Sequence, residues 1–82
     1  MNREDAEILS QYVVTILKNI RIEKGITKLE ISNKTGISRT AITLIENKKN
    51  SPTLRTLIMI SSCLNVDLKV VIQKAQLMLN SK

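Results

Sequence analysis

Only three positions of this chain carry a residue that strongly interrupts helices: Gly25, Gly36 and Pro52. Between them, apolar residues recur every three or four positions, which is the spacing that places side chains on one face of an α-helix. No stretch of useful length alternates apolar and polar residues as a half-buried strand does. The sequence therefore predicts an all-α fold in which short turns join the helices.

We expect five helices. Each one begins beside a residue that suits a helix N-terminus, and glycine or asparagine follows several of them at the other end. The expected ranges are about Asp5 to Lys24, Lys28 to Thr35, Arg39 to Asn47, Leu54 to Leu64, and about 67–80. In the fourth helix we expect an inner face made of Leu54, Leu57, Ile58, Ser61 and Leu64. No repeat or flexible linker divides the chain, which predicts one compact five-helix domain over residues 1–82.

Size and composition limit the functions that such a chain can have. A chain of 82 residues forms about one small core, which excludes a two-domain enzyme with an interdomain cleft. Tyr12 is the single aromatic residue, so Ile, Leu and Val must build that core. Proteins that stack single-stranded bases on several aromatic rings are therefore disfavoured.

The sequence has no histidine and one cysteine, Cys63. Catalysis by a Ser/His or Cys/His pair is excluded, and no intramolecular disulfide can form. A zinc site would have to depend mainly on carboxylates. We therefore expect no enzyme activity, no metal, no cofactor and no small-molecule ligand.

The N-terminal end of the chain carries no targeting signal that we can identify. Residues 2–5 are polar or charged, and the start of the chain lacks the apolar core of a signal peptide. Nowhere does the sequence contain the roughly eighteen consecutive apolar residues of a membrane-spanning helix. A reducing, cytoplasmic location is the default expectation.

The net charge of +6 favours a polyanionic partner, either nucleic acid or an anionic membrane. The positive charge is centred on residues 11–55, which contain nine of the thirteen basic residues and three of the seven acidic ones. Membrane binding is the weaker alternative, because exposed Trp or Phe does not accompany the basic residues as in interfacial helices.

The second and third expected helices are joined by a very short linker. Thr27 and Glu30 have the spacing of a capping box, and Ser38 is placed to cap the next helix. Only Gly36, Ile37 and Ser38 separate the two helices, and glycine readily adopts the positive φ of a sharp turn. This arrangement predicts two helices at a steep angle, as in a helix-turn-helix.

The segment from Thr27 to Asn47 resembles the helix-turn-helix of the Cro/repressor (Xre) family. Flanking segments 17–25 and 51–57 match as well, so that the similarity covers roughly residues 14 to 72. The resemblance implies a repressor-like, sequence-specific DNA-binding transcriptional regulator with the Arg39–Asn47 helix in the major groove of double-stranded DNA. The size and helix content are also similar to controller proteins of restriction-modification systems.

Base-reading residues are expected on the outer face of the Arg39–Asn47 helix. Ile42 and Ile45 point inward by periodicity, which leaves Arg39, Thr40, Thr43 and Leu44 outside or on the rim. The resemblance places Arg39, Thr40 and Leu44 at base edges. Alternatives are a phosphate contact or a solvated charge for Arg39, and packing at the core edge for Leu44.

Phosphate contacts are expected from residues around this helix. Lys28 occupies a position where the resembled family usually has glutamine; lysine keeps a phosphate contact but should lose the ability to brace a neighbouring side chain. Glycine is common in the family where Lys48 stands, so we expect a strained or altered turn there. The expected phosphate-contacting residues are Lys28, Ser38, Asn47, Lys48, Lys49, Asn50 and Ser51, and Thr43 offers a further donor.

Arg21 and Glu46 match positions that form an ion pair in the resembled family. We expect a partly buried pair that fixes the third helix to the first and does not contact DNA. The alternative is two independent surface charges.

The last helix, about 67–80, has apolar residues on more than one face. One face can close the core, and the remainder predicts a homodimer interface. The alternative is a longer core helix with a frayed end. The expected interface residues are Leu68, Val71, Ile72, Ala75, Met78 and Leu79, with Ile8 and Tyr12 as secondary contributors.

A two-fold dimer would present two third helices to a palindromic operator, one helical turn apart. An activator would also need a surface for RNA polymerase, which the sequence does not identify. The alternative function is an antitoxin-like interaction module whose last helix binds a toxin and which represses its own operon.

Overall fold

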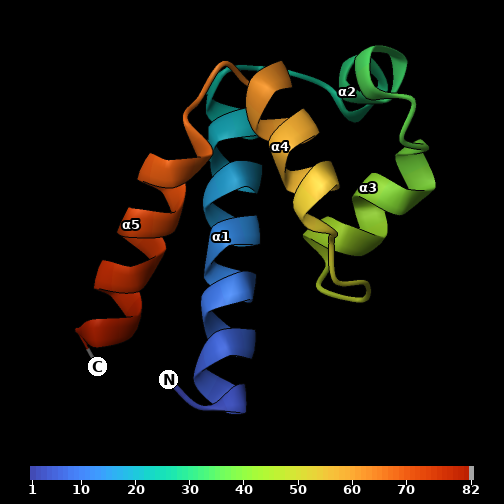
Figure 1. The fold of residues 1–82 in the computed structure, drawn as a ribbon. Coiled ribbons are helices and arrows are strands. Elements are labelled where there is room, and N and C mark those ends of the chain that lie inside the picture. The colour runs from blue at the N-terminus through green and yellow to red at the C-terminus, as the bar shows by residue number, and fades with distance from the viewer. Residues whose placement is uncertain (82) are drawn as a thin grey trace.

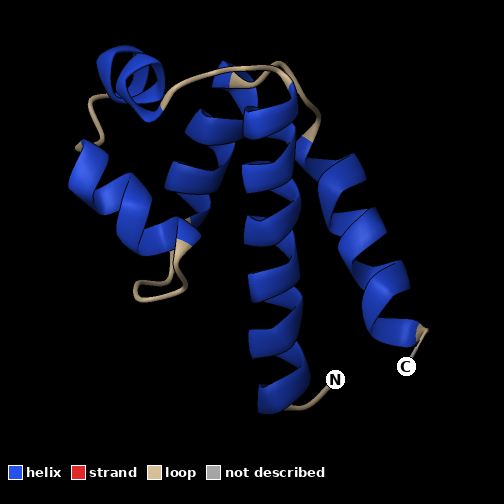
Figure 2. Cartoon of the chain, turned by 180° about the vertical axis from the view of Figure 1, so that it is seen from behind, coloured by secondary structure: helices blue, strands red, loops and turns tan. Residues whose placement is uncertain are grey.

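The computed structural model describes residues 1–81; Lys82, which we counted in the charge balance, lies outside the described residues. This part of the chain consists of helices joined by short turns and has no strand, as Figures 1 and 2 show. The all-α prediction is therefore confirmed. The helices are α1 (Arg3–Glu23), α2 (Lys28–Thr35), α3 (Arg39–Glu46), α4 (Leu54–Cys63) and α5 (Leu68–Asn80).

The helix α1 runs through the length of the molecule and organises the others. The helix α5 returns alongside α1, so that both chain ends lie at the same end of the molecule (Figure 1). On the other side of α1, the short helix α2 packs against both α3 and α4, and α3 also contacts α1. The pair α2–α3 is therefore held away from α5, on the opposite flank (Figure 2).

Side-chain caps fix where the helices begin. The side chains of Thr27, Ser38, Thr53 and Asp67 accept hydrogen bonds from backbone N–H groups at the starts of α2, α3, α4 and α5. A cap of this kind satisfies a backbone donor that the helix itself leaves free. The helix α1 begins at Arg3, two residues before the predicted start, because Asn2 supplies a cap that the sequence analysis did not identify.

The turns after α1 and α4 contain a residue in the left-handed backbone conformation, and these residues are the glycine and asparagine expected to follow the helices. Gly25 follows α1 with a φ of 68°, and Asn65 follows α4 with a φ of 57°. Asparagine tolerates this conformation better than most residues with a side chain. The helices α3 and α4 each end one residue before the predicted end, because Asn47 and Leu64 serve as C-caps.

Aliphatic side chains from every helix form the core. Ile31 of α2, Ile42 of α3 and Leu64 after α4 are the largest fully buried side chains among the described residues. Val13 and Leu17 of α1 belong to the same core cluster. The core therefore joins α2 and α3 to the long helix and fixes the angle at which they are presented.

The predicted inner face of α4 is only partly right. Leu57, Ser61 and Leu64 face the core, but Leu54 and Ile58 are 65% and 52% exposed. Ile60 is buried and lies among the core residues in their place. Apolar residues surround most of α4, so its periodicity alone does not determine which strip faces inward.

Two residues predicted for a dimer interface on α5 belong to the core instead. Val71 and Ala75 are 2% and 0% exposed and pack within the core cluster, so assigning them to an interface was wrong. The small side chain of Ala75 lies on the face of α5 that packs along α1. Of the other predicted interface residues, Leu68 and Ile72 pack at the core edge, Leu79 is half-buried and Met78 is exposed.

A leucine at position 75 should destabilise the fold. The site is fully buried, and overpacking of a core commonly costs about 1–3 kcal/mol. We expect Ala75→Leu to lower the free energy of unfolding by that amount in a urea titration. Gln76→Leu adds the same side chain at the next, exposed position and should change stability by less than about 0.5 kcal/mol. Equal effects of the two substitutions would contradict the inward orientation of Ala75.

Candidate nucleic-acid interface

The turn between α2 and α3 creates the steep two-helix unit that the sequence predicted. Gly36 has a φ of 78°, and its N–H donates to the carbonyl of Ser32 at 2.9 Å. Ser38 then caps α3 by accepting from the N–H of Ala41 at 3.0 Å. A side chain at position 36 would be strained in this left-handed conformation, which is the physical reason for glycine here.

All four residues predicted to read bases lie around one open hollow between α2 and α3. Arg21, Thr27, Lys28 and Leu29 complete its wall; the predicted readers in it are Arg39, Thr40, Thr43 and Leu44. Arg39 and Thr40 are exposed at the first turn of α3, whereas Thr43 and Leu44 are half-buried farther along it. Leu44 is thus half-buried and faces the hollow, and it is not among the side chains that pack against the core.

Sequence reasoning missed Thr27 and Leu29 as parts of this surface. Leu29 is about half exposed, and Thr27 forms the complete capping box with Glu30. The sequence alone carried no signal for these two residues, because the capping box fixes only where α2 begins and the angle between α2 and α3 brings its first turn to the hollow. The N-terminus of α2 also directs backbone N–H groups and positive dipole toward it.

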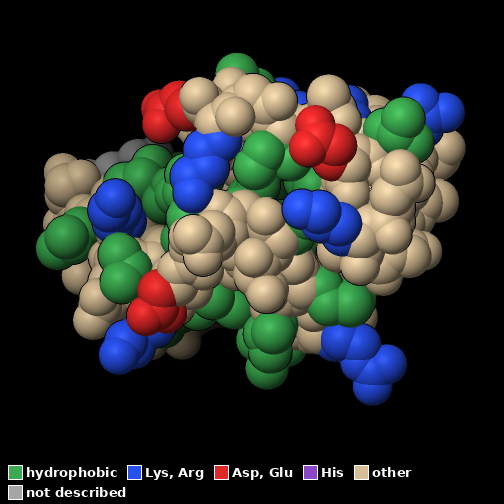
Figure 3. Space-filling view, turned by 90° about the horizontal axis from the view of Figure 1, so that it is seen from above, with side chains coloured by type: hydrophobic (Ala, Val, Ile, Leu, Met, Phe, Trp, Pro, Cys, Tyr) green, Lys and Arg blue, Asp and Glu red, His purple; other side chains and the backbone are tan. Residues whose placement is uncertain are grey.

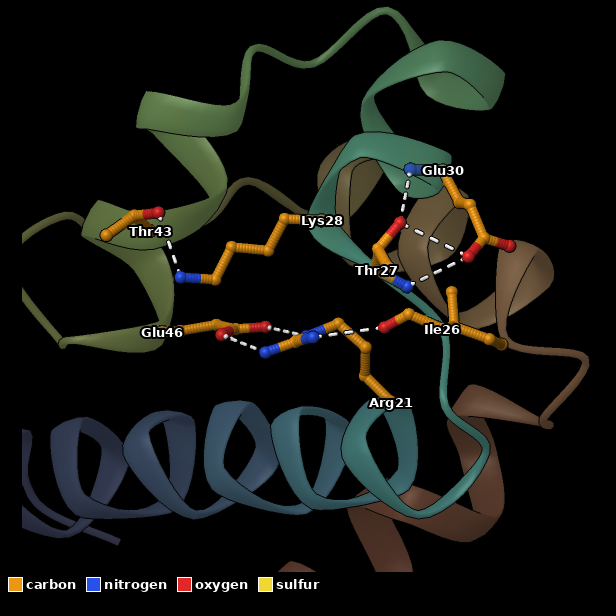
Figure 4. A network of polar contacts seen from close by, with 7 residues as sticks. All are labelled: Arg21, Ile26, Thr27, Lys28, Glu30, Thr43 and Glu46. Atoms are coloured by element: carbon orange, nitrogen blue, oxygen red, sulfur yellow. Dashed lines mark hydrogen bonds and ion pairs between the residues drawn. The ribbon is translucent and has the colours of Figure 1, made fainter.

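Lys28 does something that the sequence analysis did not expect. Its ammonium Nζ donates to Oγ1 of Thr43 at 3.1 Å, across the gap between α2 and α3 (Figure 4). The expectation that lysine at this position could not brace a neighbouring side chain was wrong. The four-carbon stem is long enough to bring the charged group to α3, and Thr43 offers an acceptor there.

The predicted pair of Arg21 and Glu46 lies beneath this contact (Figure 4). Arg21 donates from Nε to Oε2 of Glu46 at 2.7 Å and from Nη2 to Oε1 at 3.0 Å. Its third donor, Nη1, reaches the carbonyl of Ile26 at 3.0 Å. The two side chains are only 13% and 9% exposed. This two-pronged geometry is the strong form of an arginine–carboxylate contact.

The loop after α3 is tightly wound. Lys48 has a φ of 61°, a conformation that is strained for a residue with a side chain, which agrees with the strained turn expected there. The N–H groups of Lys49 and Asn50 both reach the carbonyl of Leu44, at 2.8 and 3.3 Å. This pattern closes α3 and exposes the side chains of the loop.

The structure separates the loop from the hollow that contains the reading residues. Lys48, Asn50 and Ser51 line a different depression, which they share with Glu7 and other residues of α1. Asn47 and Lys49 are exposed. The predicted phosphate-contacting residues thus form two groups: Lys28 and Ser38 beside the hollow, and the 47–51 loop beyond the end of α3.

Charge and exposed apolar groups are both visible on the outer surface. Lys and Arg side chains are scattered over the face seen in Figure 3, with hydrophobic and acidic side chains exposed between them. No group of three or more Cys, Asp or Glu side chains among residues 1–81 is placed to hold a metal ion. The hollow itself combines the basic side chains of Lys28 and Arg39 with the apolar side chains of Leu29 and Leu44.

None of the helices described is long and apolar enough to cross a membrane by itself. The helices α4 and α5 pass such a test only when taken together, by length and composition, and a bend of 109° separates them.

Comparison with known proteins identifies the family. The family model for helix-turn-helix proteins, HTH_3, matches residues 17–71. The chain belongs to this helix-turn-helix family. The matched range contains α2, α3 and α4 together with the Arg21–Glu46 pair. The family consists of transcription regulators and not of enzymes.

Two similar proteins agree with this assignment. The HTH-type transcriptional regulator SutR of Escherichia coli (strain K12) is 33% identical over 70 residues, which are 85% of this chain and 39% of SutR. The chain thus spans about two fifths of the length of SutR. The crystal structure of a point mutant of the restriction-modification controller protein C.Esp1396I matches with a TM-score of 0.72 and 34% identity, covering 83% of this chain and 87% of that one.

Removing one partner of the buried ion pair should destabilise this helix-turn-helix protein without DNA. In Arg21→Ala the carboxylate of Glu46 remains largely buried without its partner, which we expect to cost about 3 kcal/mol of unfolding free energy. Thermal or urea unfolding monitored by circular dichroism measures this. Arg55→Ala, at an exposed arginine, is the matched control and should change stability by less than about 0.5 kcal/mol. Unchanged stability of Arg21→Ala would show that the pair has no structural role.

Proposed function

We propose that this protein is a DNA-binding transcriptional regulator that inserts α3 into the major groove. The observation that carries the proposal is the shared hollow, which brings Arg39, Thr40, Thr43 and Leu44 to one surface beside the positive end of α2. A major groove about 12 Å wide admits one α-helix. Family membership supports the same function, and such a regulator acts in the cytoplasm, where the DNA is.

Within this proposal, the exposed start of α3 reads bases. The guanidinium of Arg39 suits O6 and N7 of a guanine, while the methyl of Thr40 and the side chain of Leu44 suit a thymine methyl. Arg21 lies at the wall of the hollow, but three of its five N–H donors are used by Glu46 and Ile26, and its side chain is only 13% exposed. It therefore positions α3 and does not read sequence.

The 47–51 loop has a different role in this proposal. Its side chains are exposed beyond the end of α3, and Lys48 and Lys49 provide positive charge that follows the reading helix in the chain. Contacts from such residues fix the register of the protein on the phosphate backbone without reading sequence. Ser38 lies at the opposite end of α3 from this loop. There its hydroxyl and the positive N-terminal end of the helix together contact another phosphate.

We further propose that the protein acts as a homodimer on a palindromic operator. Two copies related by a two-fold axis would place their α3 helices about 34 Å apart, in successive major grooves. Similarity to a restriction-modification controller protein, over most of both chains, supports a compact regulator of this type.

The dimer interface in this proposal centres on α4 and the start of α5. Leu54 and Ile58 are four residues apart on one face of α4 and both are more than half exposed, so together they leave an apolar strip on the surface. Ile58 also lines a surface depression with Leu68, one of the interface residues proposed from sequence. Ile58 and Leu68 thus share one surface where α4 and α5 meet, whereas Val71 and Ala75 belong to the core.

Sequence-specific binding can be tested by selection from a pool of random-sequence DNA duplexes. We expect enrichment of a two-fold symmetric sequence that binds at least about 10³ times more tightly than unselected duplex at physiological salt. On the selected duplex, Arg39→Ala should reduce discrimination at one base pair per half-site, with a loss of about 1–3 kcal/mol. Fluorescence anisotropy titrations measure both effects.

A substitution at a proposed phosphate-contacting residue, Lys49, provides the matched comparison with Arg39→Ala. Lys49→Ala should weaken binding to selected and unselected duplexes alike and lower the slope of affinity against salt by about one unit. Equal affinity for selected and random duplexes would contradict the proposed function. If Arg39→Ala and Lys49→Ala behaved identically, the division between reading and positioning residues would be wrong.

The dimer can be tested by adding a charge to its proposed interface. Ile58→Asp should produce a monomer, because an unpaired carboxylate would be buried between the two copies. Leu77→Asp is the control: Leu77 is 71% exposed on the opposite face of α5, so this substitution should leave the dimer intact. Sedimentation equilibrium measures the mass of each variant. A monomeric Leu77→Asp together with a dimeric Ile58→Asp would place the interface on the outer face of α5.

A further inference from the structure

The contact between Lys28 and Thr43 joins two side chains that belong to different helices and face the same hollow. The ammonium of Lys28 and the hydroxyl of Thr43 lie 3.1 Å apart, one hydrogen-bond length, and both residues are half-buried. Figure 4 shows the lysine extended from the start of α2 toward the middle of α3. A lysine directed across the hollow in this way does not have the orientation of a free surface charge.

The hydroxyl of Thr43 keeps its proton available. A threonine hydroxyl has one donor and can accept two hydrogen bonds. In α1 and α2, Thr15 and Thr35 donate that proton to the carbonyl four residues earlier, at 3.0 and 2.7 Å. Within the described part of the chain, Thr43 makes no such bond and uses only its acceptor, for Lys28. The cation beside Thr43 favours this orientation, in which the O–H points away from Nζ.

The charge of Lys28 is not neutralised by a carboxylate. The two acidic residues near it have other partners: Glu30 accepts from Thr27 in the capping box, and Glu46 is paired with Arg21. Lys28 forms no ion pair with any residue in 1–81. Its ammonium therefore has two unused donors and a full positive charge at the wall of the hollow.

We propose that Lys28 and Thr43 together form a specificity-determining unit that reads one guanine in the major groove. This inference rests on the proposed function and adds to it a base that the family assignment does not name. The unit presents two neighbouring donors, from Nζ and from Oγ1, held one hydrogen-bond length apart. Guanine alone presents two neighbouring acceptors, O6 and N7, on its major-groove edge.

The other bases do not match two donors. Adenine presents the N6 amino group beside N7, so Thr43 would have to accept from N6 with its remaining lone pair, and its own proton would lose the acceptor that guanine offers. Cytosine presents its N4 amino group, and thymine places a methyl group beside O4. A buried donor without an acceptor costs binding free energy, so the unit discriminates against these bases as well as favouring guanine.

This role differs from the phosphate contact expected for Lys28 from the sequence. A phosphate contact is insensitive to sequence, whereas a shared base contact requires both side chains. Arg39, at the first turn of α3, reads a separate base pair by its own guanidinium. Thr43 lies one helical turn farther along, so the two contacts fall on different base pairs.

The test compares base preferences of variants in selections from the same random-sequence duplex pool. The wild-type protein should select guanine at the position read by the unit and prefer it over adenine by roughly tenfold. Lys28→Met and Thr43→Val should each lose this preference at that one position and keep the rest of the selected sequence. The double variant should lose no more than either single variant, because the two side chains act as one unit.

Two further variants serve as controls. Thr43→Ser keeps the hydroxyl and should retain the guanine preference. Lys34→Met removes an exposed lysine from the last turn of the same helix, outside the hollow, and should leave the preference unchanged. Thermal unfolding of each variant verifies that the fold is intact before binding is compared.

The outcomes separate this inference from the proposed function. If Lys28→Met weakens binding equally on all sequences and the guanine remains, Lys28 is a phosphate contact and the inference is overturned. Selection of adenine or thymine at the position that depends on Thr43 overturns it as well. Both leave the regulator itself intact, whereas the absence of any selected sequence with the wild-type protein overturns the proposed function and this inference together.

Discussion

The geometry of the interface depends on the contact between Arg21 and Glu46. One guanidinium joins three segments: it begins on α1, takes both carboxylate oxygens at the end of α3, and binds the carbonyl of Ile26 in the turn before α2. Since α2 and α3 contain only eight residues each, neither helix would be stable by itself. The pair therefore fixes two short helices to one long helix at the point where their angle is set.

Burial makes this contact effective and also makes it costly to break. The two side chains are almost shielded from water, so their attraction is little screened. Removing a charge from water is expensive, and the cost is offset here because the carboxylate and the guanidinium bind in two places and Ile26 uses a further donor. Such an arrangement favours one orientation of α3 more than it adds to stability.

The polar surface above this pair is arranged by the same short helices. The capping box of Thr27 and Glu30 fixes the start of α2, and the start of α2 determines where the stem of Lys28 begins. From there the lysine reaches Thr43, so α2 contributes a donor to the surface of α3. A helix that supports the reading helix can in this way take part in reading.

The sequence by itself determined the features that depend on local chemistry. Caps at Thr27, Ser38, Thr53 and Asp67 and the left-handed turns at Gly36 and Asn65 follow from side chains a few residues apart, and they fixed the helices to within two residues. Only the tertiary structure decided which strip of an apolar helix faces inward. Ile60 replaced Leu54 and Ile58 in the core, and Val71 and Ala75 turned toward α1, because α4 and α5 have apolar residues on several sides and neighbouring helices select among them. The contact of Lys28 with Thr43 likewise depends on the angle between two helices, which residues distant in the chain set.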